Sequence, residues 1–338
     1  GTITLDSAAY YLAVALEEYD GSLNDNPLPP RDFTNTTNKD AIWRSRFVDN
    51  YFGNELQNYP PSYRGSGETN PSHDLVKSFP LSDGYPYEEH SEQILDILAD
   101  FSPYQFSDPR LKSSIIYDGT VLNGHPDLGL ENYLVDTYVG GEESREAFPI
   151  DGTKTGYYLK KFYNGSNTEL YPSRKNGSTV YYTAISLTNL YLFFAEILNE
   201  IMPDPNAVSE YGVSAKDILG KIRGRVGFKS LINPSDTEDH YMNEQAEAGK
   251  DAFRDLIRNE RRIELCFEDT RFWDLRRWGM DVNTPVHGIR VTLDENSPNG
   301  KNYEEFFVER RSFAAPSLPI PFRETNLMPN LKQNEGWE

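Results

Sequence analysis

The 338-residue chain contains a single cysteine, Cys266, and only five histidines. One cysteine excludes a disulfide within the chain and a cysteine-based metal cluster, so we interpret Cys266 as a small buried hydrophobic residue. No two histidines have the His-x3-His or His-Glu-x2-His spacing that argues for a zinc site. They are scattered along the sequence as His73, His90, His125, His240 and His287.

Long apolar runs and an excess of positive charge are also missing. No run of about 18 apolar residues occurs, so we expect no membrane-spanning helix. No signal peptide opens the sequence, and Gly1-Thr2 leads directly into a helical pattern, which predicts a mature fragment. Acidic residues outnumber basic ones by 53 to 33, for a net charge of -20. A surface this negative repels phosphate backbones and excludes nucleic acid as a partner.

The signatures of common catalytic sites are absent as well. There is no Gly-x-Ser-x-Gly nucleophile elbow, and no Lys-Ser/Thr follows Arg64-Gly-Ser-Gly67 to make a phosphate loop. The Asp-x-Asp-x-Asp-Gly calcium loop is missing too, which leaves open an irregular calcium site of oxygen ligands. We therefore predict no cofactor and assign no metal ligand.

Residues 251–278 carry the clearest pattern that is present. Apolar residues recur there at three- to four-residue spacing, which predicts one face of a helix: Phe253, Leu256, Ile257, Ile263 and Phe267. Acidic and basic side chains interleave on the same segment, at spacings that favour ion pairs: Glu260, Glu264 and Glu268 with Arg258, Arg261 and Arg262. The helical pattern breaks at 268–270, and a second amphipathic segment runs on to a stop signal at Gly279.

This segment gives two structural predictions. The side chains of Phe267, Trp273 and Leu275 should be buried, because they continue the apolar faces. Glu260 or Glu264 should pair with an arginine of the segment or with Arg223 or Arg225.

Outside that segment the chain alternates between helical stretches and irregular ones. Helical periodicity predicts further helices over 4–19, 72–79, 92–99, 182–201 and 214–226. Alternating patterns predict strands over 41–48, 114–117 and 156–163, and the Asn-Gly pairs at Asn123, Asn164 and Asn176 predict hairpin turns. The proline-rich tail from Leu318 to Trp337 should be extended and docked on the body, held by Pro319 and Pro321.

The order Glu260-Arg-Arg-Ile-Glu-Leu-Cys-Phe-Glu-Asp-Thr-Arg-Phe-Trp-Asp-Leu-Arg-Arg-Trp-Gly279 resembles the C-terminal signature of the SusD/RagB family. The family usually has Gly where this chain has Asp269, and Asp tolerates the left-handed backbone that such a turn requires. Shorter segments resemble the family in the same order, among them Asp108-Pro-Arg-Leu111 and Leu318-Pro-Ile-Pro321.

The resemblance implies a mainly α fold. Helix pairs like those of tetratricopeptide repeats would pack against a loop-rich irregular region with a few short β-hairpins. It also implies a division of the chain, with residues 1–65 as a remnant of the family's N-terminal half and residues 66–338 as the SusD/RagB C-terminal domain.

The resemblance further implies a function. Members are lipoproteins on the outer face of the outer membrane that capture a nutrient, commonly a glycan, without catalysis. Their partner is a TonB-dependent channel of the SusC type, over which the lipoprotein sits as a lid. The membrane contact would be a lipid anchor absent from this chain.

Two other functions stay open from the residues alone. A carbohydrate-active hydrolase would need two carboxylates across a cleft. Its general acid would need a raised pKa, whereas the arginines around Glu260, Glu264 and Glu268 favour a lowered one. A helical-repeat scaffold that binds peptides is the other alternative.

For a sugar site we look to aromatic residues in loops, because scaffolds carry binding residues on loops and a sugar offers apolar ring faces beside hydroxyls. Tyrosine is abundant here, with 22 residues in the chain. We predict Tyr85, Tyr87 and Tyr104 as stacking platforms, with Tyr63 and Arg64 at the rim.

Overall fold

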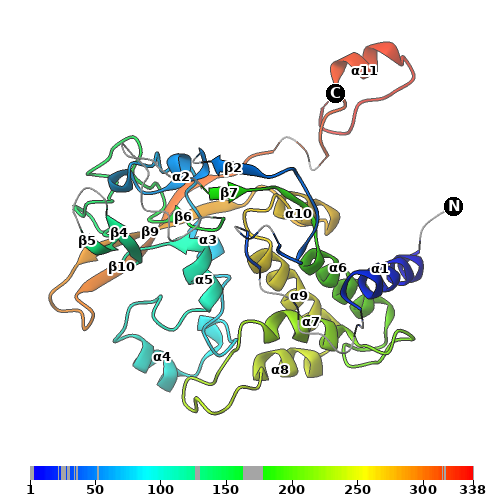
Figure 1. The fold of residues 1–338 in the computed structure, drawn as a ribbon, viewed down its shortest axis with the longest axis horizontal. Helices are drawn as coiled ribbons and strands as arrows, with labels where there is room; N and C mark the ends of the chain where they lie inside the picture. The colour runs from blue at the N-terminus through cyan, green and yellow to red at the C-terminus, as the bar shows by residue number, and fades with distance from the viewer. Residues whose placement is uncertain are drawn as a thin grey trace.

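The computed structural model describes residues 4–21, 23, 28, 31–33, 35, 37–51, 53–125, 130–162, 178–313, 315 and 317–337. The longer helices gather on one side of the molecule, and short helices, strand pairs and loops occupy the other (Figure 1). This arrangement confirms the predicted mainly α fold with a loop-rich irregular region and short hairpins.

The helical side contains α1 (Leu5–Asp20), α6 (Leu187–Ile201), α7 (Ala215–Gly224), α8 (His240–Ala248), α9 (Lys250–Glu264) and α10 (Arg271–Arg277). Helix α6 lies at its centre and packs on α1, α7 and α9, while α8 packs on α9. The core between these helices is mainly aliphatic, with Leu192, Leu198, Ile218 and Ile257 fully buried. Helix α6 begins later than the periodicity predicts, because 183–186 form a strand and Ser186 caps the helix by accepting from the Asn189 amide at 3.1 Å.

The apolar face of α9 is buried as the sequence predicts, and the chain then reverses at 265–270. Phe267 and Asp269 both take left-handed backbone conformations, with φ of 64° and 59°. The prediction that Asp269 tolerates this conformation is confirmed.

The burial prediction for α10 holds only in part. Leu275 is buried, whereas Trp273 is 57% exposed and Phe267 is half-buried. The expectation for Trp273 is wrong because α10 turns Asp274 and Leu275 inward. Asp274 is held there by Arg261 at 3.1 Å, and this ion pair decides which face of the short helix is covered.

A buried charge network joins the helices to the irregular region. Glu260 accepts from Arg223 of α7 at 3.1 Å and also contacts Arg110 of α5 (Pro109–Ser114). Glu264 lies 2.8 Å from Arg110 and 3.1 Å from Arg225. The predicted pairing of these two glutamates is therefore confirmed.

The irregular side is built from short helices and two-stranded sheets. Its helices are α2 (Gly53–Asn58), η1 (Pro61–Tyr63), α3 (His73–Val76), η2 (Tyr87–Glu89), α4 (Glu92–Leu98) and α5. Its antiparallel pairs are β2 (Val48–Tyr51) with β7 (Ser178–Val180), β3 (Ile115–Ile116) with β6 (Tyr158–Leu159), β4 (Val121–His125) with β5 (Leu130–Leu134), and β9 (Pro285–Leu293) with β10 (Lys301–Arg310). A further pair, β1 (Ala41–Arg44) with β8 (Thr183–Ser186), lies where this region meets α6.

Sequence patterns located these strands less well than the helices. The single strand predicted over 41–48 is two strands with different partners, and the long β9–β10 hairpin has no counterpart among the predictions. Asn123 lies inside β4 rather than in a turn, because the connection to β5 comes after His125. Asn164 and Asn176 lie outside the described residues.

The C-terminal tail differs from its prediction. It carries α11 (Phe322–Leu327) and projects from the body (Figure 1). The tail closes on itself: the Trp337 indole donates to the Ser317 carbonyl at 2.7 Å, and Gln333 bonds both backbone groups of Ile320. Since these bonds are internal, the tail holds its shape without the predicted docking.

Residues before the predicted boundary at 65 share the core of the helical side. Ala9, Ala13 and Leu16 of α1 pack in the same apolar cluster as α6. The division into 1–65 and 66–338 stays a prediction. In the described part of the chain, no helix has both the length and the apolar composition needed to cross a bilayer.

Candidate functional site

The five predicted site residues do not form one surface. Tyr63 ends η1 and is 3% exposed, with its ring 5.9 Å from that of Tyr59 and 5.4 Å from that of Tyr133. Placing Tyr63 at a rim is therefore wrong, because it fills a small aromatic cluster. Arg64 follows in a left-handed conformation and is half-buried.

Tyr104 is also buried, at 3% exposure, so the prediction of an open stacking face there is wrong. Its ring stacks on Tyr117 at 4.2 Å, and its hydroxyl lies 3.0 Å from that of Tyr157. Burial raises the pKa of the Tyr104 phenol well above its usual value. A tyrosine whose hydroxyl has a partner can be fully enclosed, which is why its loop position did not imply exposure.

Tyr85 and Tyr87 remain accessible. Tyr85 is half-buried against Tyr241, with ring centroids 5.1 Å apart, and its hydroxyl donates to Glu244 at 2.6 Å. Tyr87 begins η2 and is 42% exposed.

Tyr87 lies at a pocket of about 250 Å³, which we call the aromatic pocket. Two stretches far apart in sequence line it. The first supplies Leu81, Tyr87, Leu98, Ala99, Phe101, Ser102, Pro103 and Phe106, and the second supplies Ser297, Asn299, Lys301, Asn302 and Tyr303 at the tip of the β9–β10 hairpin.

Specific contacts hold the hairpin tip against the first stretch and against Asp118. The Asn299 amide donates to the Phe101 carbonyl at 2.9 Å. Lys301 donates to the buried Asp118 carboxylate at 2.5 Å. Tyr104 packs edge-on against Tyr303 at 6.0 Å, so the buried tyrosine supports the pocket wall from behind.

The pocket residues from the hairpin were missed from sequence, although one signal was available. Asn299-Gly300 is an Asn-Gly pair at a hairpin tip, and Gly300 has a φ of 75°. Nothing in the local pattern tells that this tip lies against Phe101. Chemically, the pocket combines ring faces with side-chain amides, which is the combination that a sugar ring and its hydroxyls require.

A second pocket, of about 400 Å³, borders the turn after α9, and we call it the turn pocket. Its aromatic lining is Phe33, Phe162, Tyr181, Tyr182 and Phe267, and the rest is Ser45, Arg46, Val48, Asn58, Leu159, Thr183, Glu268 and Asp269. Residues 163–177, next to Phe162, lie outside the described residues. All lining residues of the aromatic pocket and their chain neighbours are described, so it is the better-defined candidate.

The glutamates of α9 and the turn are not arranged for acid catalysis. Arg225 and Arg110 outweigh burial and hold the pKa of Glu264 at about 2. Lys161 and Arg31 likewise lower the pKa of Glu268 despite its burial. These groups stay ionised near neutral pH, whereas a general acid must hold a proton.

Glu143 has the opposite environment. Burial raises the pKa of its carboxyl, and its partners are the hydroxyls of Ser62 and Tyr133. Its exposure is 0%, so a substrate cannot reach it in this conformation.

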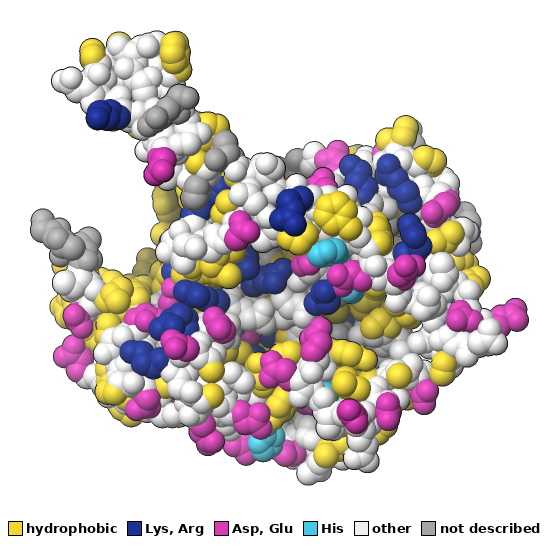
Figure 2. Space-filling model, turned by 180° about the vertical axis from the view of Figure 1, so that it is seen from behind, with side chains coloured by type: hydrophobic (Ala, Val, Ile, Leu, Met, Phe, Trp, Pro, Cys, Tyr) yellow, Lys and Arg dark blue, Asp and Glu magenta, His cyan; other side chains and the backbone are white. Residues whose placement is uncertain are grey.

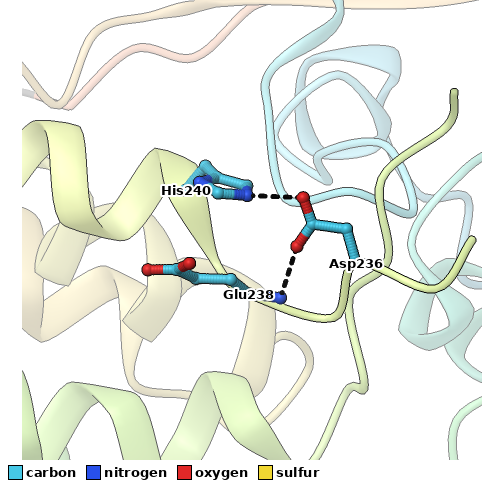
Figure 3. A group of neighbouring side chains, drawn as sticks. All are labelled: Asp236, Glu238 and His240. Carbon is cyan, nitrogen blue, oxygen red and sulfur yellow. Dashed lines mark hydrogen bonds and ion pairs between the residues drawn. The ribbon is translucent and has the colours of Figure 1, made fainter. Parts of the chain in front are cut away.

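Figure 3 shows the group of described side chains that comes nearest to a cation site: Asp236, Glu238 and His240. One Asp236 oxygen lies 2.9 Å from the His240 ring and the other accepts from the Glu238 amide at 3.2 Å. The hydrogen bond to Asp236 raises the pKa of His240, which favours the protonated ring over a metal ligand. These contacts form the turn before α8, and this role accounts for the cluster.

Comparison with known proteins gives the chain a family. The model of the SusD family matches residues 32–337. A curated relative, SusD-like protein P2 of Formosa agariphila, is 32% identical over 155 residues, which are 45% of this chain and 26% of the relative.

Solved structures share the fold. A SusD-like protein from Bacteroides fragilis has a TM-score of 0.67 at 24% identity, over 98% of this chain and 65% of that one. A SusD-like carbohydrate binding protein from the same species has a TM-score of 0.61 at 21% identity, over 97% and 64%. The chain thus spans less than two thirds of these relatives. Because the family model covers most of its length, the chain belongs to the SusD family.

Proposed function

We propose that this protein binds a glycan at the bacterial cell surface without catalysis and delivers it to a SusC-like TonB-dependent outer-membrane transporter. The observation that carries the proposal is the match to the SusD family over residues 32–337. A solved relative of the same fold is described as a carbohydrate binding protein, which supports a sugar as the ligand. The location follows from the same proposal: the outer face of the outer membrane, held by a lipid anchor.

The aromatic pocket is the proposed binding site. Tyr87, Phe101 and Tyr303 offer ring faces for stacking, and Asn302 offers an amide for sugar hydroxyls. Its volume of about 250 Å³ is smaller than the ~300–1,000 Å³ of pockets that enclose drug-sized ligands. We therefore assign it one sugar residue of a longer chain, whose remainder lies along the neighbouring surface.

Among the residues predicted from sequence, Tyr85 and Tyr87 stay in the proposal. Tyr87 contributes directly to the pocket, and Tyr85 flanks the same segment. Tyr104 is reassigned as a support behind Tyr303. The role of Arg64 stays a prediction.

The absence of catalysis is also part of the proposal. Its support is the ionisation of the glutamates of α9 and the turn, and the enclosure of Glu143 described above. A hydrolase would need one accessible carboxyl that holds its proton beside one that does not.

The first test is a screen of neutral plant and host oligosaccharides, followed by calorimetric titration of the best ligand. Tyr87→Ala and Tyr303→Ala should each weaken binding by about 1–3 kcal/mol, which is typical of a lost stacking contact at a hot spot. The melting temperature of Tyr87→Ala should stay near that of the parent, whereas Tyr303→Ala should melt lower because it also loses its packing on Tyr104. Tyr10→Ala is the matched control, because Tyr10 is 55% exposed on α1, outside the pocket lining.

Four results would count against parts of the proposal. Normal binding by both pocket variants would move the site, and loss of binding in Tyr182→Ala would place it in the turn pocket. Release of reducing ends from any oligosaccharide would favour the hydrolase. Failure to co-purify with a SusC-like transporter from the native membrane would remove the delivery step.

A further inference from the structure

A chain of contacts leads from the surface to the wall of the aromatic pocket. It begins at His73, the first residue of α3, whose Nδ1 atom lies 2.8 Å from the Tyr157 hydroxyl. The Tyr157 hydroxyl in turn lies 3.0 Å from that of Tyr104. Tyr104 packs edge-on against Tyr303 of the pocket lining, with 6.0 Å between the ring centres. One titratable ring is therefore connected to the pocket through two buried tyrosines.

The outer end of this chain is a charged cluster that solvent can reach. The His73 side chain is 15% exposed, and its Nε2 atom lies 3.5 Å from the Glu305 carboxylate. Lys77 donates to the same carboxylate at 2.5 Å, and this bond lowers the pKa of Glu305. His287 lies 3.8 Å from Glu305 and 2.7 Å from Asp74, which completes the ionisable groups on the outer side of His73. Figure 2 shows histidine side chains at the surface among acidic and basic ones, near the middle of the face that it draws.

The Glu305 carboxylate decides which nitrogen of neutral His73 carries the proton. An ionised carboxylate only accepts hydrogen bonds, so the nitrogen that faces it, Nε2, is favoured as the N–H of the ring. Nδ1 is then an acceptor, and the Tyr157 hydroxyl donates to it. The Tyr157 oxygen accepts in turn from the Tyr104 hydroxyl. While His73 is neutral, every proton along the chain has an acceptor.

Protonation of His73 removes one of these acceptors. Both ring nitrogens then donate, so Nδ1 can no longer accept from Tyr157 and donates to its oxygen instead. Burial raises the pKa of the Tyr157 and Tyr104 phenols, so both hydroxyls keep their protons. Among the described residues, neither hydroxyl has a hydrogen-bond partner outside this chain. One hydroxyl proton is therefore left without an acceptor in the core, and such a group is costly to bury.

The burial of the two tyrosines transmits this loss to the pocket. Tyr157 is 0% and Tyr104 3% exposed, so water cannot replace the missing acceptor unless one of the rings moves. Tyr104 stacks on Tyr117 at 4.2 Å and supports Tyr303 from behind, so a shift of Tyr104 reaches the pocket wall. Burial also lowers the pKa of His73 from 6.5, which agrees with a fold that accommodates the neutral ring.

We propose that His73 positions the wall of the aromatic pocket: the neutral ring holds Tyr303 in place through Tyr157 and Tyr104, and uptake of a proton by His73 loosens it. His73 is a positioning residue, because it is not among the residues that line the pocket. The coupling between His73 and Tyr303 stands on the contacts described here. Its consequence rests on the proposed function: a sugar bound against Tyr303 binds more weakly in mild acid than at neutral pH.

The first experiment follows the histidines and Tyr303 by NMR without any sugar, between about pH 7.5 and 5. The ¹⁵N shifts of His73 should show an Nε2–H ring at neutral pH and a titration below pH 6.5. The ring signals of Tyr303 should shift with the same midpoint. In His73→Asn, a side-chain oxygen replaces the Nδ1 acceptor and does not titrate, so the Tyr303 signals should keep their neutral-pH positions.

Stability gives a second readout of the same coupling. The folded-state pKa of His73 is lowered, so its contribution to stability is complete above pH 6.5 and is lost as the pH falls through the lowered value. The urea midpoints of the parent and of His73→Asn should be similar at neutral pH. Below pH 6.5 the parent should fall further than the variant, and a parallel decline in the two would count against the proposal.

The binding experiment uses the neutral oligosaccharide that titrates most tightly in the screen described above. Between about pH 7.5 and 5.5 its affinity should fall about fivefold or more in the parent, as for the loss of one buried hydrogen bond, and less than about twofold in His73→Asn. His240→Asn is the matched control, because His240 lies on α8 and pairs with Asp236 outside this cluster. It should show the same fall in affinity as the parent.

The outcomes separate the two proposals. If no neutral oligosaccharide binds, the proposed function fails, while the NMR titration still decides the coupling. Tyr303 signals that ignore the titration of His73, or that still shift in His73→Asn, would overturn the coupling. Loss of the shift in His287→Asn would assign it to the charge of the outer cluster and would overturn it as well. If His73→Asn does not fold, Tyr157→Phe interrupts the chain at its middle, and Tyr303 should no longer follow the titration of His73.

Discussion

The helical side and the irregular side of this protein bury different kinds of side chain. Between α1, α6, α7 and α9 the core is mainly aliphatic, and helix backbones satisfy their own hydrogen bonds. On the irregular side the cores are rich in tyrosine, including Tyr104, Tyr157 and Tyr158. The Tyr158 hydroxyl accepts from the Thr153 amide at 2.9 Å and donates to the Glu143 carbonyl at 2.9 Å. On the irregular side, tyrosine hydroxyls supply hydrogen-bond partners to backbone groups, which within a helix bond to one another.

Buried acids differ between the two sides as well. Glu264 on α9 is surrounded by arginines, which hold its pKa at about 2. Glu143 on the irregular side has hydroxyl partners, and burial raises its pKa. The comparison teaches that Glu264 is buried as a charge among arginines, whereas Glu143 is buried among hydroxyl groups, where the protonated carboxyl is favoured.

Removal of Glu264 should give the largest effect. Glu264→Ala leaves Arg110 and Arg225 buried without this partner, and we expect unfolding free energy to fall by about 3–5 kcal/mol. Urea denaturation measures the change. The control is Asp251→Ala. The Asp251 side chain is 95% exposed, and loss of its ion pair with Arg254 should cost at most ~1 kcal/mol of stability. Equal losses in the two variants would show that burial of the network does not matter.

A fall in pH should have the second largest effect, because it protonates Glu264 in the same network. The folded-state pKa of Glu264 is lowered from 4.5 to about 2, so its contribution is complete above pH 4.5 and is lost as the pH falls towards 2. The loss should be about 3 kcal/mol, at roughly 1.4 kcal/mol per pKa unit. Urea midpoints measured across this window test it. Glu264→Gln should show a shallower pH dependence, and an unchanged slope would contradict the assignment to Glu264.

Removal of a single tyrosine hydroxyl on the irregular side should have a smaller effect on stability. It tests whether such hydroxyls stabilise the backbone there. Tyr158→Phe leaves the Thr153 amide and the Glu143 carbonyl without this partner, and should cost about 1–3 kcal/mol. Tyr191→Phe is the matched change on the helical side. It removes a bond to Asp20, a side chain that water can reach, and should cost less. Thermal unfolding compares the two, and a greater loss in Tyr191→Phe would reverse the comparison.

The smallest effect should come from α10. Trp273→Ala removes a ring that is 57% exposed, and stability should change by about 0.5 kcal/mol or less. Calorimetric melting is sufficient to measure it. A loss of several kcal/mol would restore the prediction from sequence that Trp273 belongs to the core.

The sequence by itself determined the features that depend on neighbours along the chain. Periodicity located α9 and its buried face, because residues three and four apart lie on the same side of a helix. The same segment predicted the pairing of Glu260 and Glu264 and the turn at Asp269, and its residue order indicated the family.

Only the tertiary structure decided which side chains are covered. Tyr87 and Tyr104 have similar loop surroundings in sequence, yet one is 42% exposed and the other 3%. The aromatic pocket needs Phe101 beside Asn299, and the buried charge network needs Arg110 beside Glu264. These contacts join segments far apart in the chain, and no local pattern encodes them. Whether a side chain is buried depends on which distant segment packs against it, and that packing exists only in the folded chain.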